Sequence, residues 1–369
     1  MALAFAQIAK EEGFSPFFLT PSVSLHHTLR RNLHLNFPPL THRQDFQGYP
    51  CYQMGASFPE FESRAHRFDQ RSLDRILDSC ASCFAISGNN HAARPFLDTG
   101  RPYSVWTATT FWEDCEHRIE QTHFSPRKLL DLLSKPMCGT LEHRVFKRSN
   151  KIAVISTYTR DHVLRLDPQW ATKVQVIHPP VDCAIYQPLL KERQPTILFV
   201  GRLSDPRKNL SLLLTAFSRC AREVPDLQLE LMGSAEPATP QMLSNHPYAH
   251  RIHWKGPATE ADKIHAIQRS LVLVIPSFQE GFAIVGAEAL ACGTPVVSTR
   301  CGGTTDHVLH EQTGLLVEDF DPQSLADAIL RLIHDPLLYA KLSRQARDFA
   351  EKHLSLQAIR PHLQRLICN

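Results

Sequence analysis

Residues 271–290, LVLVIPSFQEGFAIVGAEAL, run from a short apolar segment through a polar loop into a segment whose apolar residues have helical spacing. The pattern predicts a buried strand over 271–275, a loop around Glu280 and a helix that begins near Phe282. A strand followed at once by a helix is the repeating unit of a parallel sheet that helices cover on both faces.

Similar units fill the second half of the chain. Short apolar strands are predicted over 196–200, 227–232, 251–256, 294–298 and 314–317, with helices around 210–220, 260–270 and 287–291 and from Pro322 onward. Their alternation predicts an α/β fold with a doubly wound parallel sheet.

The first half is less regular. Strands are predicted over 84–87, 103–106, 153–156 and 174–177. Residues 35–70 show no clear period, and we expect long loops or short helices there. The chain opens on a predicted helix that contains Phe5 and Ile8. We therefore expect the strand that usually opens an α/β domain to be missing.

Composition narrows the class of protein. The chain has 369 residues, 43% of them apolar and 21% charged, and no apolar run approaches the roughly 18 residues of a membrane span. Its net charge of +3 is too small to indicate nucleic-acid binding. The first 180 residues carry 21 Lys and Arg against 17 Asp and Glu. This positive balance would allow the first half to bind an anionic acceptor molecule or a membrane surface. Of the ten Cys, only Cys80 and Cys83 have metal or redox spacing, so we expect reduced thiols and a cytoplasmic protein.

Two carboxylates mark the segment quoted first. Glu280 lies in the loop and Glu288 eight residues further on, roughly 12 Å along a continuous helix. That spacing suits the two ends of an extended ligand, a sugar and a ribose, and is too great for a retaining glycosidase pair. The alternative is a solvated helix with two surface acids.

Two other loops follow directly on predicted strands. In the first, Gly201 permits close backbone approach, while Arg202 and Lys208 can converge on an anion. In the second, Gly303 allows the backbone to approach a ligand. The alternatives are a capped helix start with basic surface residues and a plain turn. Because ligands bind beyond the carboxyl ends of parallel strands, the three loops together predict a nucleotide-sugar site.

The ordered motifs resemble those of the retaining glycosyltransferases of family 4 over roughly residues 150–335. They are Gly201-Arg202…Lys208-Asn209, Glu280-Gly-Phe…Glu288-Ala, Gly293-Thr-Pro-Val-Val297 and Gly302-Gly303…Thr313-Gly-Leu-Leu316. The resemblance implies the GT-B fold, two facing Rossmann-like domains with the active site between them. It assigns residues 1–185 to an acceptor-binding domain, 186–350 to a nucleotide-sugar-binding domain and 351–369 to a C-terminal helix that packs back on the first domain.

The resemblance also implies roles for single residues. Arg202 and Lys208 would hold the donor diphosphate, Glu280 would contact sugar hydroxyls, and Glu288 would bind the ribose. The backbone at Gly281, Phe282 and Ala283 would meet the sugar and the phosphate. Family members usually need no metal, so we expect no cofactor besides the nucleotide sugar as co-substrate.

The chain departs from the family pattern at several positions. Many relatives have Glu where Asp306 stands and Gly where Ala283 stands, and the N-terminal glycine-rich loop is absent. A His that often follows a strand of the N-terminal domain is replaced within 105–111. The candidates on the acceptor side are therefore His91, Thr109 and Tyr158, for which structural roles and helix capping are the alternatives.

The expected activity is that of a retaining hexosyltransferase, in which an acceptor hydroxyl attacks the donor from the front face and the leaving phosphate assists deprotonation. The acceptor would be a glycan, a lipid or a small molecule, with no nucleic-acid partner. Rival functions are another GT-B enzyme, such as a sugar epimerase or phosphorylase, and a catalytically silent nucleotide-sugar-binding protein. No Gly-x-Gly-x-x-Gly opens a βα unit, which argues against a dinucleotide oxidoreductase.

Overall fold

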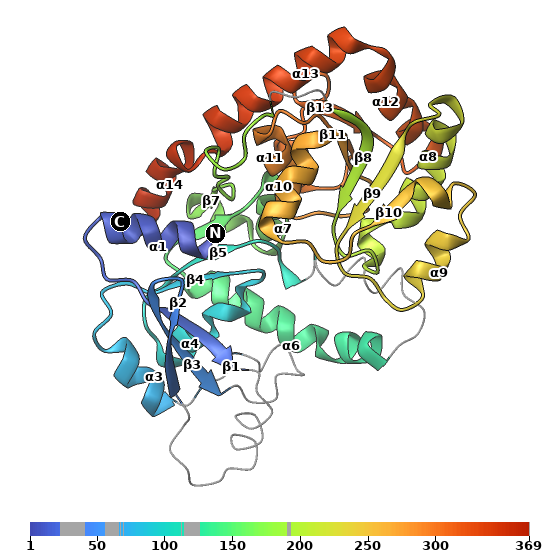
Figure 1. Cartoon of the computed structure of the whole chain (residues 1–369). Coiled ribbons are helices and arrows are strands. Elements are labelled where there is room, and N and C mark those ends of the chain that lie inside the picture. Colours follow the sequence, from blue (N-terminus) through green and yellow to red (C-terminus); the bar gives the residue numbers. More distant parts are fainter. Residues whose placement is uncertain are drawn as a thin grey trace. The chain divides into compact units, whose positions relative to one another are not determined.

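The computed structural model describes residues 1–22, 41–55, 66, 68, 70–111, 113, 126–189 and 193–368. The chain divides into two units, Met1–Ile177 with Arg360–Asn369 and His178–Ile359. The division falls earlier than the boundary we placed at residue 185, and it assigns the end of the last helix to the first unit. Figure 1 labels the helices and strands of both units.

The second unit is built on a parallel sheet of six strands in the order β10-β9-β8-β11-β12-β13. The strands are β8 (Gln194–Val200), β9 (Gln228–Met232), β10 (Ile252–Trp254), β11 (Ser270–Ile275), β12 (Val296–Thr299) and β13 (Gly314–Val317). All neighbours pair in parallel. The strands predicted for the second half are confirmed, with bounds that shift by one or two residues.

Helices cover this sheet. They are α8 (Leu210–Glu223), α9 (Thr239–Ser244), α10 (Glu260–Arg269), α11 (Ile284–Ala291), α12 (Pro322–His334) and α13 (Pro336–Phe349). Helix α8 buries Leu213, Phe217 and Cys220 at helical spacing, and these residues join a core that includes Leu325 and Ile329 of α12. Burial of each such side chain contributes about 1.5–3 kcal/mol, so the apolar stripes hold the helices on the sheet.

The strand order reverses direction between β8 and β11. From β8 the chain builds outward through β9 to β10, and it then returns to the other side of β8 to add β11, β12 and β13. In open α/β sheets such a switch point leaves a crevice beyond the carboxyl ends of the two central strands. The loops after β8 and β11, which carry the predicted site residues, begin at that point.

The first unit holds two sheets. The four strands predicted for this half are present as β4 (Phe84–Ser87), β5 (Ser104–Thr107), β6 (Ile152–Val154) and β7 (Val174–Val176). They form a parallel sheet in chain order. The second sheet has the order β1-β3-β2, with β1 (Phe18–Ser22), β2 (Thr41–Phe46) and β3 (Tyr49–Gly55). The helices of the unit are α1 (Ala2–Glu11), α3 (Gln70–Leu77), α4 (Arg94–Thr99), α6 (Pro126–Arg148), α7 (Thr157–Leu166) and most of α14 (Leu356–Cys368).

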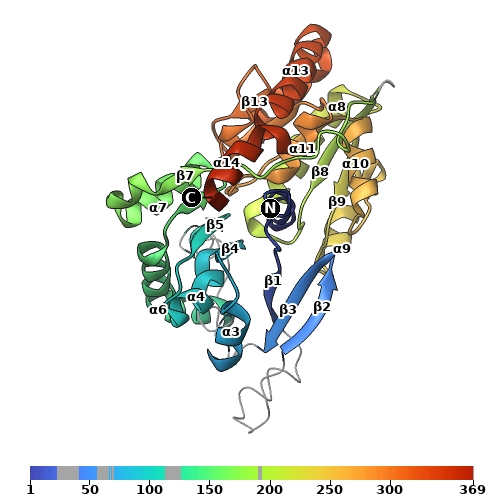
Figure 2. The same cartoon turned by 90° about the vertical axis from the view of Figure 1, so that its left-hand side faces the viewer.

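The opening segment is the helix we predicted. Helix α1 buries Phe5 and Ile8, and the Phe5 ring contacts Phe84 of β4 at a centroid distance of 4.7 Å. Figure 2 looks along this helix, beside the strands of the first unit. The strand β1 follows α1 rather than preceding it.

The expectation of loops or short helices over residues 35–70 is wrong for 41–55, where β2 and β3 form an antiparallel hairpin. Its two-residue turn places Gln47 at φ +51° and Gly48 at φ +83°, which is the geometry of a type I′ turn. Aromatic cross-strand pairs such as Phe46 opposite Tyr49 stabilise the hairpin in place of a simple apolar and polar alternation. The rest of 35–70 lies mainly outside the described residues.

A buried histidine supports helix α11. His307 is fully buried, and in the described part of the chain neither of its ring nitrogens has a hydrogen-bond partner. Its ring packs against Phe282 at 4.6 Å and against Gly286, where a Cβ would lie 2.5 Å from Nε2. Gly286 therefore leaves room for the imidazole, although glycine within a helix costs about 0.5–1 kcal/mol relative to alanine.

This histidine gives the fold a pH dependence. Burial, with a smaller contribution from His178, lowers the pKa of His307 from 6.5 to about 3. The unfolded chain therefore binds the proton first, so the stability that His307 contributes is complete above pH 6.5 and is lost as the pH falls toward 3.

We predict that His307→Leu flattens the fall in unfolding free energy below pH 6.5, by up to about 1.4 kcal/mol per pH unit. Denaturant titrations at a series of pH values measure this slope. The exposed His265 serves as the control, and His265→Leu should leave the slope unchanged. Equal slopes in the wild type and in His307→Leu would contradict the assignment.

Candidate functional site

The loop after β8 forms the first wall of the candidate site. Gly201 N donates to Met232 O, and Leu203 N donates to Ser234 O, so this loop runs alongside the loop after β9. The two backbones approach so closely that a Cβ on Gly233 would lie 1.9 Å from Gly201 O. Gly233 also has φ +136°, a backbone conformation that residues with a side chain rarely adopt. Both the available space and the backbone conformation therefore require glycine there.

Lys208 and Glu280 meet across the switch point. Lys208 Nζ donates to Glu280 Oε1 at 2.7 Å, and both side chains are largely buried. Ser277 Oγ donates to the same oxygen at 2.6 Å. Among the described residues Glu280 Oε2 accepts no further hydrogen bond, and two of the three ammonium donors of Lys208 remain for a ligand.

Arg202 lies apart from this pair. Its guanidinium donates to Asp205 Oδ2 at 2.6 Å, and its side chain is 63% exposed. Arg207 binds the same carboxylate at 2.9 Å. Burial acts to raise the pKa of Asp205, but Arg207 and Arg202 outweigh it and hold the pKa below its ordinary value. The Arg202 side chain is thus exposed to solvent and bound to Asp205.

Backbone hydrogen bonds join the three predicted loops. Phe278 N donates to Arg207 O at 2.7 Å, which ties the loop after β11 to the loop after β8. Glu280 N donates to Cys301 O at 2.7 Å, and Gly303 N donates to Glu280 O at 2.9 Å. These two bonds tie the loop after β11 to the loop after β12. The structure therefore brings the three loops together at one edge of the sheet.

Unpaired amides lie at the start of helix α11. Ala283 has φ +59°, which turns the chain into the helix in a left-handed conformation. Within the described part of the chain, the N–H groups of Gly281, Phe282 and Ala283 donate to no protein atom. Such amides and the positive end of the helix dipole suit a phosphate.

The buried side chain of Phe282 holds this turn in place. Its ring is 1% exposed and lies between His307 and His178, stacked on His178 at 5.2 Å. His178 Nδ1 lies 3.8 Å from the carboxylate of Asp306. The Phe282 side chain therefore fixes the backbone whose amides face the site.

Glu288 belongs to a second polar cluster, near the start of α10. Its carboxylate accepts a hydrogen bond from Lys263 Nζ at 2.8 Å, and Lys263 also lies 3.1 Å from Glu260. Tyr186 donates to Glu260. Burial raises the pKa of Glu288, although Lys263 opposes the shift. The surface-acid alternative does not fit either acid, because Glu280 is 9% exposed and Glu288 7%.

The acceptor-side candidates all follow strands of the first unit. His91 lies in the short helix after β4, Thr109 follows β5, and Tyr158 lies at the start of α7, after β6. The loops after β4 and β5 are linked, because Thr109 N donates to Gly88 O at 2.8 Å.

The three side chains differ in access to solvent. His91 is 1% exposed, its Nε2 lies 3.2 Å from Cys138 O, and burial lowers its pKa to about 4. Thr109 and Tyr158 are half-buried. The cap of α7 is Ser156, whose hydroxyl accepts a hydrogen bond from Thr159 N.

Sequence reasoning missed the partners of the two acids. Ser277 could have been found, because a hydroxyl three residues before a loop acid is well placed to bond it. Lys263 and Tyr186 lie far from Glu288 in the sequence, and no local pattern indicates either of them. Asp205 lies within a loop that we singled out, yet its two arginine partners are apparent only in three dimensions.

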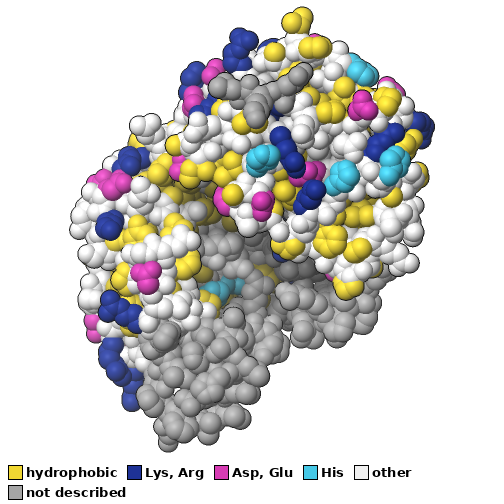
Figure 3. All heavy atoms as spheres, in the orientation of Figure 1, with side chains coloured by type: hydrophobic (Ala, Val, Ile, Leu, Met, Phe, Trp, Pro, Cys, Tyr) yellow, Lys and Arg dark blue, Asp and Glu magenta, His cyan; other side chains and the backbone are white. Residues whose placement is uncertain are grey.

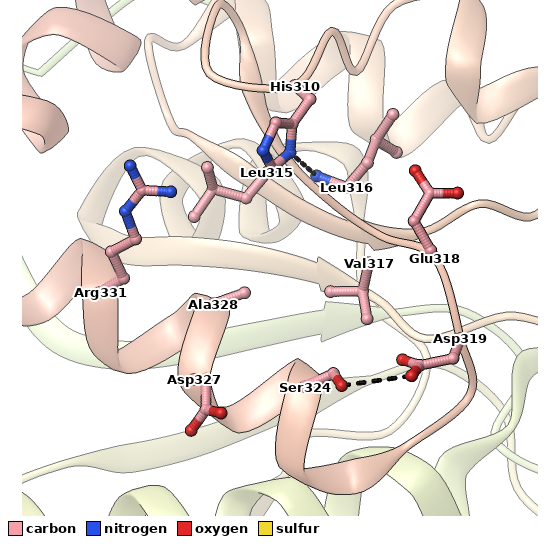
Figure 4. Close-up of a pocket in the computed structure, with 10 residues that line it drawn as sticks. All are labelled: His310, Leu315, Leu316, Val317, Glu318, Asp319, Ser324, Asp327, Ala328 and Arg331. Carbon is pink, nitrogen blue, oxygen red and sulfur yellow. Dashed lines mark hydrogen bonds between the residues drawn. The ribbon is translucent and has the colours of Figure 1, made fainter.

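A separate cavity of about 340 Å³ lies between β13 and α12. Figure 4 shows that it is lined by charged side chains of both signs and by none of the predicted site residues. Two of these charges are already paired, Arg331 with Glu311 and Glu318 with Arg300, each at 2.6 Å. It offers no concentration of one charge for a nucleotide.

The described residues contain no group of three or more His, Cys, Asp or Glu that could hold a metal ion. One Asp-x-Asp sequence occurs, at Asp319 and Asp321. Asp321 Oδ2 accepts a hydrogen bond from Ser324 N at 2.9 Å, and Asp319 lies 3.4 Å from the Ser324 hydroxyl. These carboxylates cap helix α12. Metal independence stays a prediction.

Comparison with known proteins gives the context for this geometry. The sequence profile of glycosyl transferases group 1 matches residues 184–349. A D-inositol 3-phosphate glycosyltransferase of Pseudarthrobacter chlorophenolicus is 30% identical over 190 residues, which cover 47% of this chain and 45% of that protein. One of Nocardioides sp. is 27% identical over 219 residues, 51% and 48% of the two chains. The chain thus spans about half the length of the curated relatives it matches.

Solved structures show the same fold over nearly the whole chain. Sucrose-phosphate synthase from Thermosynechococcus elongatus superposes with a TM-score of 0.78 at 18% identity, covering 98% of this chain and 90% of that one. Anabaena HepE in complex with UDP-glucose has a TM-score of 0.71 at 18% identity, with 99% and 95% coverage. The fold is GT-B, with Rossmann-like α/β units. Residues 184–349 are therefore similar to the domain shared by glycosyl transferases group 1, and the whole chain has the fold of these solved glycosyltransferase structures.

Proposed function

We propose that the chain is a retaining hexosyltransferase that moves a hexose from a nucleoside-diphosphate sugar to an acceptor hydroxyl. The observation that carries this proposal is the junction of three loops at the switch point, where Lys208 pairs with Glu280 and three unpaired amides follow Glu280 along the chain. Positive groups beside a buried carboxylate suit a ligand with an anionic middle and a hydroxyl-rich end.

The positive groups act on the leaving diphosphate. In the reaction the acceptor oxygen bonds to the anomeric carbon, the bond from that carbon to the phosphate oxygen breaks, and the acceptor proton goes to the diphosphate. Lys208 and the amides of Gly281 to Ala283 stabilise the negative charge that grows on the diphosphate, and they need little rearrangement because the protein already holds them in place. Arg202 binds the outer phosphate oxygens from the mouth of the loop.

The two acids hold the two ends of the donor. Glu280 keeps Oε2 for hydroxyls of the sugar, while Lys208 and Ser277 orient the carboxylate through Oε1. Glu288 takes the vicinal hydroxyls of the ribose. Lys263 donates to Glu288 Oε1 and opposes the rise that burial causes in the pKa of Glu288, which favours the carboxylate form that accepts hydroxyl groups.

The acceptor binds at the first unit, where His91, Thr109 and Tyr158 follow neighbouring strands. Two kinds of relative carry a phosphate in their names, D-inositol 3-phosphate glycosyltransferase and sucrose-phosphate synthase. Together with the basic excess of the first 180 residues, this favours an anionic acceptor.

The proposed location is the cytoplasm, with peripheral contact at the inner face of a membrane. None of the helices in the described ranges is both long and apolar enough to cross a bilayer. On the face shown in Figure 3, Lys and Arg lie among Asp, Glu and His rather than in one stripe. Nucleic-acid binding usually requires such a stripe, so no nucleic-acid partner is proposed.

A donor screen tests the proposed function. The chain is incubated with UDP-, GDP- and ADP-sugars, and melting temperature and release of nucleoside diphosphate are measured with and without acceptors. A matched donor should raise the melting temperature and be consumed with an acceptor present. Isomerised sugar without acceptor would indicate an epimerase, sugar 1-phosphate a phosphorylase, and binding without turnover a silent protein. Because HepE was solved with UDP-glucose, that donor is tested first.

We predict that Lys208→Ala slows the chemical step, because the leaving diphosphate loses a charged donor. The activation free energy of that step should rise by on the order of 2.7–4 kcal/mol. Single-turnover kinetics with the matched donor measures the loss. Lys341→Ala, at an exposed position of α13, is the matched control and should retain the full rate. A rate for Lys208→Ala close to that of the wild type would refute the role.

We predict that Glu288→Gln weakens binding of the nucleoside diphosphate by about 1.5–3 kcal/mol, since hydrogen bonds to a charged acceptor are lost, with less effect on turnover of bound donor. Calorimetric titration gives the affinity. Glu223→Gln, at an exposed position of α8, is the control. Unchanged affinity of Glu288→Gln would remove the ribose assignment.

A further inference from the structure

A second cavity, of about 270 Å³, lies within the first unit. It forms where the end of α1, the start of β1 and the β2–β3 hairpin meet. The residues that give it chemical character are two cations and four aromatic side chains: Lys10, Arg43, Phe14, Phe17, Tyr49 and Tyr52. Nothing in the proposed transfer reaction uses it.

Backbone geometry holds the walls of this cavity in place. Helix α1 ends in a Schellman turn, in which Gly13 has φ +88° and Phe14 N donates to Ala9 O at 3.0 Å. The hairpin ends in its type I′ turn, closed by Asp45 Oδ1, which accepts from Gly48 N at 2.9 Å. The cavity is therefore built by two tight turns.

The two cations have no ion pair within the described ranges. Lys10 Nζ lies over the Tyr49 ring at 6.0 Å, and the Arg43 guanidinium lies over Tyr52 at 5.9 Å. The nearby acids are bound elsewhere: Glu11 to Arg360, and Glu12 to Gln364 at 2.7 Å. The cavity thus presents positive charge that the described chain leaves unneutralised.

Aromatic side chains surround these charges. Phe14 is 38% exposed, and Phe46, at the hairpin turn, is 42% exposed. Tyr49 and Tyr52 are half-buried rings with a polar end. In membrane proteins, tyrosine side chains are enriched at the level of the lipid headgroups. There the apolar part of the ring contacts the acyl chains and the hydroxyl contacts water. Cations beside them attract anionic headgroups.

We propose that this cavity binds the phosphate headgroup of an anionic lipid and attaches the first unit to a bilayer surface. Lys10 and Arg43 contact the phosphate, and Phe14 and Phe46 enter the boundary with the acyl chains. The inference deepens the peripheral contact proposed above and is independent of the transfer chemistry. The cavity lies at the amino ends of β1 and β3, where Phe18 and Tyr49 begin the strands, whereas substrates of α/β sheets bind at carboxyl ends.

Charge reversal tests the proposal. The full chain and Lys10→Glu/Arg43→Glu are sedimented with vesicles of phosphatidylcholine, with and without phosphatidylglycerol. The wild type should bind only the anionic vesicles, and the variant should bind them about tenfold or more weakly. The matched control, Arg71→Glu/Arg75→Glu, makes the same change in net charge at exposed positions of α3 and should bind like the wild type.

Two further arms identify the source of the phosphate. Glycerol 3-phosphate should compete only weakly, and Phe14→Ser/Phe46→Ser should reduce vesicle binding while leaving the lysine and arginine in place. Full competition by glycerol 3-phosphate, with no effect of the phenylalanine changes, would overturn the lipid in favour of a soluble phosphate ligand. Equal loss in the α3 control, or no binding by the wild type, would overturn the site.

A fold control separates this test from the proposed function. Each variant is also heated with and without the nucleoside diphosphate that stabilises the wild type. The nucleotide shift in melting temperature should be the same in all variants, because the second unit is unchanged. Loss of vesicle binding with an unchanged nucleotide shift supports the lipid site. Loss of both vesicle binding and the nucleotide shift shows that the variant is misfolded, and Phe14→Ser/Phe46→Ser then becomes the deciding variant.

Discussion

The ion pair between Lys208 and Glu280 is the contact on which the candidate site depends. It joins the loop after β8 to the loop after β11 at 2.7 Å, and the backbone of Glu280 joins both to the loop after β12. A largely buried carboxylate without its cation would be costly, so the pair also fixes which loops can lie together. The remaining donors of Lys208 then point to a ligand, because the described protein uses only one of them.

The topology explains why this contact arises where it does. Parallel strands end at one edge, and the reversal of strand order between β8 and β11 leaves room between the loops that follow them. Helix α11 begins in that space through a left-handed Ala283, and the buried His307 packs against Gly286 in its first turn. The same packing that holds the helix therefore fixes the turn that carries its unpaired amides.

How far sequence reasoning reaches differs between the two halves. In the second unit, strands such as β11 and β12 are buried on both faces and read as continuous apolar runs, so their positions could be predicted to within one or two residues. The hairpin of β2 and β3 could not, because its aromatic side chains follow no simple alternation and its turn uses Gln47-Gly48 instead of a commoner pair. Among site residues, the three loops could be predicted from their place after strands. The pairing of Glu288 with Lys263 and of Arg202 with Asp205 is set by tertiary packing.

The most direct measurement is a crystal structure of the chain with UDP bound. The account predicts that diphosphate oxygens lie within about 3 Å of Lys208 Nζ and of the amide nitrogens of Gly281 to Ala283, with the ribose hydroxyls on Glu288. A diphosphate bound away from the loops after β8 and β11, or one that contacts neither Lys208 Nζ nor the amides of Gly281 to Ala283, would contradict it.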